Sequence, residues 1–461
     1  MTENAAGPAT WSSRFVFYLG VVGAAVGLGS IWRFPYLAGT SGGSAFILVF
    51  VLAIGLIATP LLAAEFLIGR RARSSPPTAA GEVARQSGLG ARSRRWNAIG
   101  LLGTTAAFLI LSYYAVVAGW VLAYTWKCAS GALSGLPRAE VTTLWRRFLS
   151  SPVEMGAWHL AFVALVAYFS ARGLHRGIEL ATKIRGPALL GLLLVLDVYA
   201  LASGESRRGL AFAFAPNFDA ITPEVVLVAI GQAFYATGVG MAMMLAYGAY
   251  VSRGTSLVRS AAIISGSILL VSLLSTLLVF PLVFHYGMNP AQGPELVFDV
   301  LPKAFAEMPA GRLVGSLFFL LLVFAALTPS IAALEPTVAH VLQRTRLRRG
   351  PAVLLSAGAV WLLGLASVLS FNLWARWHPL GFLPSFAQRT WFDTADYVAS
   401  NLLLPLGAVL TSIFVGWRLD RAAVAEELAE TTPFARRACV FLLRTVCPVA
   451  IVVVLIAKLL G

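Results

Sequence analysis

The chain has 461 residues, of which 58% are apolar and only 12% are charged. A typical soluble protein carries about 25% charged residues, so this composition excludes most soluble enzymes, disordered scaffolds and extracellular disulfide modules. The net charge of +15 does not indicate a nucleic-acid partner, because the Lys and Arg residues separate apolar runs and form no stripe with aromatic residues.

Apolar runs long enough to cross a bilayer recur along the whole chain. A spanning helix needs about 20 apolar residues, and the run from Ala98 to Trp126 contains no Asp, Glu, Lys or Arg at all. We therefore expect an all-α integral membrane protein with about 11 transmembrane helices. The predicted spans are 14–38, 43–68, 97–126, 157–171, 178–203, 224–250, 258–285, 312–342, 351–371, 397–417 and 438–458.

The basic residues between the spans predict the orientation. If the N-terminus is cytoplasmic, the inside segments hold 22 Lys and Arg, the outside segments hold 11, and Arg33 and Arg444 lie within spans. This two-to-one ratio favours a cytoplasmic N-terminus over residues 1–13, and an odd number of spans places Gly461 outside. The polar start shows no cleavable signal pattern, so we expect the first span to be retained.

Glycine-rich interruptions lie in the middle of the first and sixth spans, at Gly23–Ser30 and Ala236–Met241. One interpretation is close helix packing through small residues. The other is a pair of helices broken at the membrane midplane, as in transporters built from inverted repeats. Because the two interruptions lie five spans apart, we favour the second interpretation.

Sequence motifs in the same regions point to one family. The segment GAAVGLGSIWRFPYLAGTSGGSAF begins at Gly23, and further motifs lie at Ser112–Trp120, Gly231–Tyr235 and Phe392–Asp396. In this order they resemble the bacterial branch of the neurotransmitter:sodium symporter family. The resemblance implies a LeuT-type fold with two inverted five-helix repeats, helices 1 and 6 broken at the midplane, and a peripheral eleventh helix. In this sequence the first repeat corresponds to 14–203, the second repeat to 224–417 and the eleventh helix to 438–461.

The resemblance also implies a substrate pocket. In the family, the substrate carboxylate meets backbone amides at the first helix break and a tyrosine hydroxyl, which here is Tyr114. Gly27 stands where members that carry biogenic amines have an aspartate, so an amino acid with its own carboxylate is favoured. Small residues and an adaptable methionine predict room for an apolar or aromatic side chain. The implied substrate-binding residues are Ala24, Ala25, Gly27, Ile110, Tyr114, Tyr235, Gly238, Met241 and Ala333.

Of the two sodium sites of the family, one is largely retained here. The matching ligands of the second site are the carbonyls of Gly23, Val26 and Ala325 and the hydroxyl of Thr328, although Pro329 replaces a serine. The first site retains Ala25, but Ser30, Ala236 and Ile268 stand where an asparagine, a threonine and another asparagine are usual. We therefore expect a single sodium ion. We predict no chloride, because Phe50 replaces the tyrosine of the family's chloride site, although Ser272 falls where chloride-independent members carry a glutamate.

Charged residues inside the spans are few, and each needs a partner. Arg33 is the only charged residue between Phe15 and Ala64, and an unpaired arginine in the membrane costs about 2.5 kcal/mol or more. By resemblance, Arg33 and Asp396 form an extracellular gate, and the alternative is a static ion pair. Glu65 and Glu335 are implied to hold backbone groups near the broken helices, and a proton relay is the alternative.

The leading function is therefore sodium-coupled uptake of an apolar or aromatic amino acid by alternating access, in a bacterial-type inner membrane. Proton coupling or exchange on the same fold is the closest alternative, because the sodium sites are incomplete. A transport-inactive amino-acid sensor is a further one. We expect no enzyme, since the chain contains no HExxH, GxSxG or paired-acid motif. The expected partners are an amino acid and the lipid bilayer, and no oligomeric state is indicated.

Overall fold

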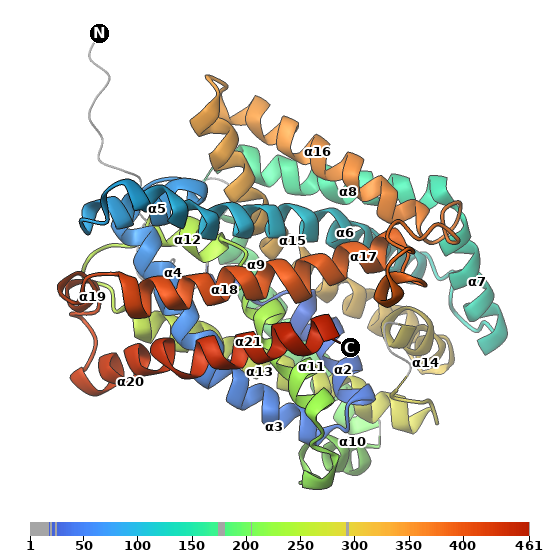
Figure 1. The fold of residues 1–461 in the computed structure, drawn as a ribbon. Helices are drawn as coiled ribbons and strands as arrows, with labels where there is room; N and C mark the ends of the chain where they lie inside the picture. The colour runs from blue at the N-terminus through green and yellow to red at the C-terminus, as the bar shows by residue number, and fades with distance from the viewer. Residues whose placement is uncertain are drawn as a thin grey trace.

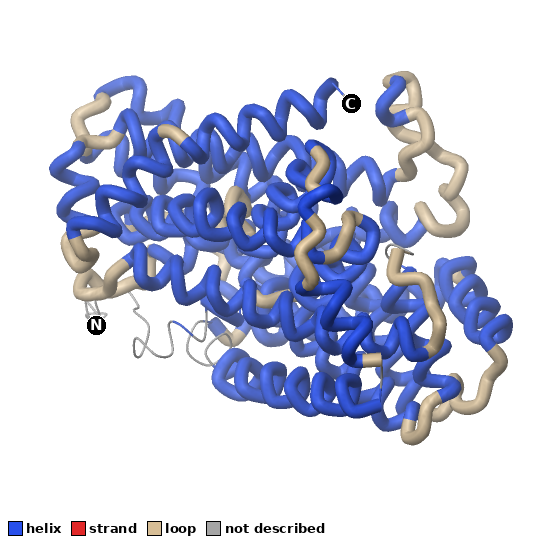
Figure 2. Tube along the Cα trace, turned by 90° about the horizontal axis from the view of Figure 1, so that it is seen from below, coloured by secondary structure: helices blue, strands red, loops and turns tan. Residues whose placement is uncertain are grey.

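The computed structural model describes residues 18, 21–23, 25–173, 180–203, 205–291 and 295–460. Over these residues the chain forms helices joined by loops, and no strand is present, as Figure 2 shows. The prediction of an all-α fold is confirmed.

The first half of the described chain begins with short helical pieces around the first break and continues with long helices. Helix α4 follows α3 through a stretch of π-helix, so that the second predicted span is one continuous rod. The elements are η1 (Gly29–Arg33), α2 (Phe34–Thr40), α3 (Ser44–Ala53), η2 (Ile54–Ala58), α4 (Thr59–Ala72), α5 (Pro76–Gln86), η3 (Gly90–Trp96), α6 (Asn97–Ala129), α7 (Arg138–Ser150), α8 (Pro152–Ala171), α9 (Leu180–Ser203) and α10 (Ser206–Phe214).

The second half likewise contains both short helical pieces and long continuous helices. It contains η5 (Phe218–Ala220), α11 (Pro223–Thr237), α12 (Met243–Gly248), α13 (Leu257–His285), η6 (Leu296–Val300), α14 (Leu301–Glu307), α15 (Gly311–Arg344), α16 (Arg349–Leu369), η7 (Pro384–Phe386), α17 (Trp391–Tyr397), η8 (Val398–Leu403), α18 (Leu404–Ile413), η9 (Phe414–Arg418), α19 (Arg421–Glu427), α20 (Pro433–Arg444) and α21 (Val446–Leu460).

Eight helices in the described residues are long and apolar enough to cross a membrane, and a bent pair, Gly186–Ala202 with Ser206–Phe214, would make nine. The sixth predicted span is absent from this number because it is broken into α11 and α12. Only scattered residues before Ala25 are described, so most of the first span lies outside the described residues. The predicted number of eleven therefore remains a prediction.

Two predicted spans begin earlier in the structure than hydropathy indicated. Helix α8 begins at Pro152, not at residue 157, because the Ser151 hydroxyl accepts the amide of Glu154 at 3.2 Å and caps the helix. The tenth span begins at Trp391, not at residue 397, because Thr390 and Asp393 form a capping box. In both cases an acidic residue in the first turn lowers the local hydropathy while it stabilises the helix start.

The long helix α6 packs against α15, α8, α16 and α18, which places it at the centre of the bundle in Figure 1. Of its most apolar stretch 83% is buried inside the protein, against 28% for the span Pro433–Ala457 at the C-terminal end. The central helices therefore surround the interior, and the span that contains α21 lies at the periphery, with most of its apolar stretch not buried by protein.

Candidate substrate pocket at the helix breaks

The sixth span is interrupted between α11 and α12 by backbone that an ordinary helix cannot adopt. Gly238 and Gly240 have φ values of 67° and 84°, in the left-handed region that glycine tolerates, and Ala242 shares that region at φ 56°. The carboxylate of Glu65 on α4 accepts the freed amide of Gly240 at 2.7 Å. This bond agrees with the role that the family resemblance implies for Glu65.

The first span is interrupted at Val26 and Gly27, directly before the amide of Leu28. That amide donates to the hydroxyl oxygen of Tyr114 on α6 at 3.2 Å, and Gln232 of α11 donates to the carbonyl of Gly29 at 2.7 Å. Side chains from other helices therefore satisfy the backbone groups that the break releases, as burial in a membrane requires.

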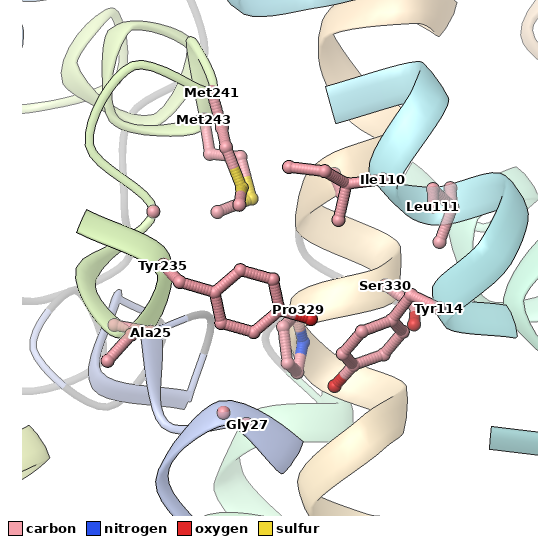
Figure 3. Close-up of a pocket in the computed structure, with 14 residues that line it drawn as sticks. Ala25, Gly27, Ile110, Leu111, Tyr114, Tyr235, Met241, Met243, Pro329 and Ser330 are labelled. Carbon is pink, nitrogen blue, oxygen red and sulfur yellow. The ribbon is translucent and has the colours of Figure 1, made fainter. Parts of the chain in front are cut away.

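A cavity of about 450 Å³ lies between the two breaks, α6 and α15. Figure 3 shows Tyr235 in the middle of the view, with Met241 and Met243 above it, Ile110 and Leu111 across the space, and Tyr114 and Gly27 below. The cavity is lined by Ala25, Gly27, Gly29, Ile110, Leu111, Tyr114, Tyr235, Ala236, Gly238, Met241, Met243, Pro329, Ser330 and Ala333.

The structure brings eight of the nine predicted substrate-binding residues into this lining, and Ala24 lies outside the described residues. Sequence reasoning missed Gly29, Leu111, Met243 and Ser330 as lining residues, and it considered Ala236 and Pro329 only for the ion sites. Met243 could have been found from Met241, because both follow the glycines of the same break. Leu111 is adjacent to Ile110, and the α6 residues that follow, up to Val121, are all buried, so this part of α6 faces protein on every side.

None of the described residues that line the cavity carries a charged side chain. Its polar groups are the hydroxyls of Tyr114, Tyr235 and Ser330, and the Ser330 hydroxyl already donates to the carbonyl of Ala326 at 2.8 Å. Since the Tyr114 oxygen accepts the amide of Leu28, its own proton remains to be donated. The wall therefore offers a directed hydroxyl donor beside a helix break, surrounded by apolar surface.

A second, wider cavity of about 1310 Å³ lies beyond Tyr114 and Tyr235, which line both cavities. Its wall holds the predicted gate: the Arg33 guanidinium lies 3.9 Å from the Asp396 carboxylate and 4.2 Å from the centre of the Tyr235 ring. Asp396 also accepts the hydroxyls of Tyr113 at 2.9 Å and Ser400 at 3.0 Å. The gate residues therefore lie in the wall of the wider cavity, and Arg33 packs on Tyr235, one of the two tyrosines that line both cavities.

Three of the four predicted sodium ligands, Gly23, Val26 and Thr328, line one further cavity. Ala325 does not line it, but it is buried one turn before Pro329 in α15. Proline has no N–H group to donate to the carbonyl four residues earlier. Pro329 therefore supplies no hydroxyl ligand, and it also leaves the Ala325 carbonyl without its usual helical donor.

At the first sodium site of the family, the side chains are mostly unsuited to a cation. Ala236 and Ile268 offer no side-chain oxygen, and both are buried. The hydroxyls of Ser30 and Ser272 are buried with no hydrogen-bond partner among the described residues, while the Ser275 hydroxyl donates to the Ser30 carbonyl at 2.8 Å. A hard cation needs several oxygens, and this region supplies fewer than the second site does.

Two further acids lie inside the helix bundle. Glu335 does not contact a helix break through any hydrogen bond of the described residues; it accepts two bonds from Arg349, at 3.0 and 2.7 Å. The family-based expectation for this residue remains a prediction, and the structure adds a pairing with Arg349, at the start of α16, that the sequence did not indicate. Asp197 on α9 is 4% exposed, and neither of its oxygens has a hydrogen-bond partner among the described residues.

Comparison with known proteins agrees with this geometry. The model of the sodium:neurotransmitter symporter family matches residues 8–147 and 150–460. The chain is 36% identical to the uncharacterised sodium-dependent transporter YhdH of Bacillus subtilis, over 97% of each chain. It is 33% identical to an uncharacterised sodium-dependent transporter of Haemophilus influenzae, over 94% of this chain and 93% of that one.

A solved structure matches as well. The crystal structure of MhsT in complex with L-phenylalanine superposes with a TM-score of 0.89 at 36% identity, covering 98% of this chain and 100% of that one. The relatives are transporters and not enzymes, and the fold agrees with that of MhsT. The chain therefore belongs to the sodium:neurotransmitter symporter family of membrane transporters.

Proposed function

We propose that the protein takes up an apolar or aromatic amino acid, driven by one sodium ion, by alternating access between the two sides of the membrane. The observation that carries this proposal is the uncharged cavity at the helix breaks. It offers the Tyr114 hydroxyl and backbone amides to a carboxylate and an apolar wall to a side chain. MhsT, whose structure the chain resembles, holds L-phenylalanine.

The size of the lining residues supports this substrate class. Gly27, Gly238 and Ala333 leave space, and the flexible chains of Met241 and Met243 adapt to the shape of a ligand. A side-chain carbon on Gly27 would lie 2.8 Å from the Pro329 ring and 3.2 Å from the Tyr114 hydroxyl. An acidic residue here would therefore displace its neighbours, and the substrate itself must bring the carboxylate.

The proposed sodium ligands are the carbonyls of Gly23, Val26 and Ala325 with the hydroxyl of Thr328. Carbonyl oxygens at a helix break suit a small hard cation. Pro329 supports the assignment because it leaves the Ala325 carbonyl free of an intrahelical bond. The first site of the family contributes nothing in this proposal, since Ala236 and Ile268 supply no oxygen, and chloride plays no part.

Proton coupling or exchange is the second candidate. The observation in its favour is the incomplete set of sodium ligands, together with the second oxygen of Glu65, which is buried and has no hydrogen-bond partner among the described residues. A carboxyl group placed next to the sixth helix break could bind and release a proton during transport.

We further propose that the N-terminus lies in the cytoplasm and Gly461 outside, in a bacterial inner membrane. The two five-helix repeats then cover 14–203 and 224–417, and 438–461 forms the peripheral eleventh helix. The distribution of basic residues and the position of α21 at the edge of the bundle support this topology.

Uptake into proteoliposomes tests the function. Each of the common amino acids is offered under a sodium gradient alone, a proton gradient alone, or neither. We expect uptake of apolar or aromatic amino acids only with sodium, with a hyperbolic dependence on sodium concentration and a Hill coefficient of about one. Full uptake in sodium-free buffer would overturn the coupling proposal. Uptake restricted to amines that lack a carboxylate would overturn the substrate proposal.

Two matched variants identify the ion site. Thr328→Ala removes the only side-chain ligand, so sodium activation should be lost, whereas Ser30→Ala should change it little. Both replacements remove one hydroxyl from a buried position, so the pair controls for the loss of a hydroxyl as such. Activation that is sigmoidal in the unmodified protein and hyperbolic in Ser30→Ala would instead assign a role to the first site.

A further inference from the structure

A third cavity, of about 910 Å³, lies away from the transport path between α19, α20 and the end of the tenth span. Four arginines line it: Arg421, Arg436, Arg437 and Arg444. We propose that this cavity binds the headgroup of an anionic phospholipid from the surrounding membrane. The site is independent of the substrate pocket and of the ion that drives transport.

The helical register gathers charge and apolar surface on the same face. Arg437, Val440, Phe441 and Arg444 are spaced three and four residues apart, so they lie along one side of α20. Arg421 and Val424 lie in the same way on α19. Planar guanidinium groups bind phosphate oxygens with paired hydrogen bonds, and the valines and Phe441 offer contact to the glycerol and the first acyl carbons.

The charge of this cavity is not neutralised from within the protein. The acids at the end of α19 are engaged elsewhere: Glu427 pairs with Arg70 at 2.7 Å, and Glu426 pairs with Arg71 at 2.9 Å. Among the described residues, no carboxylate lies within 4.0 Å of the guanidinium nitrogens of the four cavity arginines. Arg444 instead donates to the carbonyl of Gly416 at 2.6 Å. The cavity therefore presents net positive charge.

The position at the end of a lipid-facing helix favours a phospholipid over a soluble phosphate. The span that contains α20 and α21 is the least buried of the eight, and Val449, Val452, Val453 and Ile456 of α21 are exposed to the surroundings. Phe441, which lines the cavity, is 61% exposed, and Phe434 in the first turn of α20 is 83% exposed. Aromatic rings next to arginines are typical of the membrane interface, where the headgroup phosphates lie.

Native mass spectrometry of the purified full-length protein tests this proposal. Phosphatidylglycerol is titrated against phosphatidylcholine, and inorganic phosphate is added at the same concentration in a third series. We expect phosphatidylglycerol to bind at least about tenfold more tightly than phosphatidylcholine, since each arginine near an anionic headgroup adds to the attraction. Inorganic phosphate should neither bind detectably nor displace the lipid.

The double variant Arg436→Gln/Arg437→Gln should lower the affinity for phosphatidylglycerol to within about twofold of that for phosphatidylcholine. The matched control is Arg146→Gln/Arg147→Gln, which removes two adjacent exposed arginines from α7 and should bind like the unmodified protein. The single variant Arg421→Gln, on the other helix of the cavity, should weaken phosphatidylglycerol binding by a smaller factor and guards against a folding defect in α20.

Three results would each overturn the proposal. The first is equal binding of the two lipids by the unmodified protein. The second is unchanged phosphatidylglycerol binding in both cavity variants. The third is displacement of the lipid by an equal concentration of inorganic phosphate, which would assign the cavity to a soluble anion instead.

Discussion

Two arginine–carboxylate pairs, one in the wall of the wide cavity and one between the ends of α4 and α19, differ in length, burial and surroundings. Arg33 and Asp396 are 3.9 Å apart, their side chains are 19% and 33% exposed, and a wide cavity surrounds them. Arg70 and Glu427 are 2.7 Å apart, and their side chains are only 3% and 10% exposed. Arg70 also donates to the carbonyl of Thr255 at 2.8 Å and to the carbonyl of Glu427.

The two pairs should differ in how easily they break. Breaking the Arg70 pair leaves a charge and several carbonyls without partners away from water, whereas the Arg33 pair separates into a space that can hydrate both groups. We infer that the Arg33 pair opens with little loss of stability and that the Arg70 pair is a structural clamp.

Arg70→Gln should lower the free energy of unfolding most, by about 3–5 kcal/mol, because it leaves the buried Glu427 with only the longer contact to Arg71 at 3.6 Å. The effect is measured as the loss of folded protein on heating, followed by fluorescence-detected gel filtration. Arg71→Gln is the comparison: its shorter contact, at 2.9 Å, is with the exposed Glu426, and Glu427 keeps its contact with Arg70. We therefore expect a change of at most about 1 kcal/mol. Equal effects of the two substitutions would contradict the clamp.

Tyr114→Phe removes the hydroxyl that stands between the two cavities and accepts the amide of Leu28. A hydrogen bond to a charged group contributes about 1.5–3 kcal/mol, so substrate affinity should fall about tenfold or more. Scintillation proximity binding measures this change. Tyr113→Phe is the matched control, since that hydroxyl contacts Asp396 and does not line the substrate pocket. Unchanged binding in Tyr114→Phe would remove this residue from the site.

Asp396→Asn should lower stability less than Arg70→Gln does, because the Arg33 pair is long and partly exposed and borders a wide cavity. The amide oxygen still accepts the hydroxyls of Tyr113 and Ser400. If the pair closes over bound substrate, transport should nevertheless fall while the melting temperature stays nearly constant. A large drop in melting temperature with normal transport would instead make the pair a static ion pair.

The helical fold and the position of the pocket could both be predicted from the sequence. Apolar runs are long in a membrane protein, and the glycines that interrupt the first and sixth spans are the residues at which the backbone turns, as Gly238 and Gly240 show. Helix starts were harder to predict, because the caps at Ser151 and Thr390 lie outside the apolar runs. Hydropathy reports burial in lipid and gives no weight to a capping hydrogen bond.

The contacts of individual side chains could be predicted only in part. The cost of an unpaired charge indicated that Arg33 needs a partner, the family resemblance pointed to Asp396, and this contact is present. The pairing of Glu335 with Arg349 could not be predicted in the same way, because it depends on how the loop after α15 returns to the bundle. Likewise, no periodic pattern distinguishes the buried Asp197 from its apolar neighbours on α9.

The adjacent residues Thr328 and Pro329 face two different cavities, one proposed for the ion and one for the substrate. A rotation of α15 that draws Thr328 towards a cation must therefore also move the Pro329 ring, which forms part of the substrate wall. Such a shared element makes the two binding equilibria interdependent, and thermodynamic linkage requires the effect to be reciprocal. The factor by which sodium raises the affinity for the amino acid must equal the factor by which the amino acid raises the affinity for sodium.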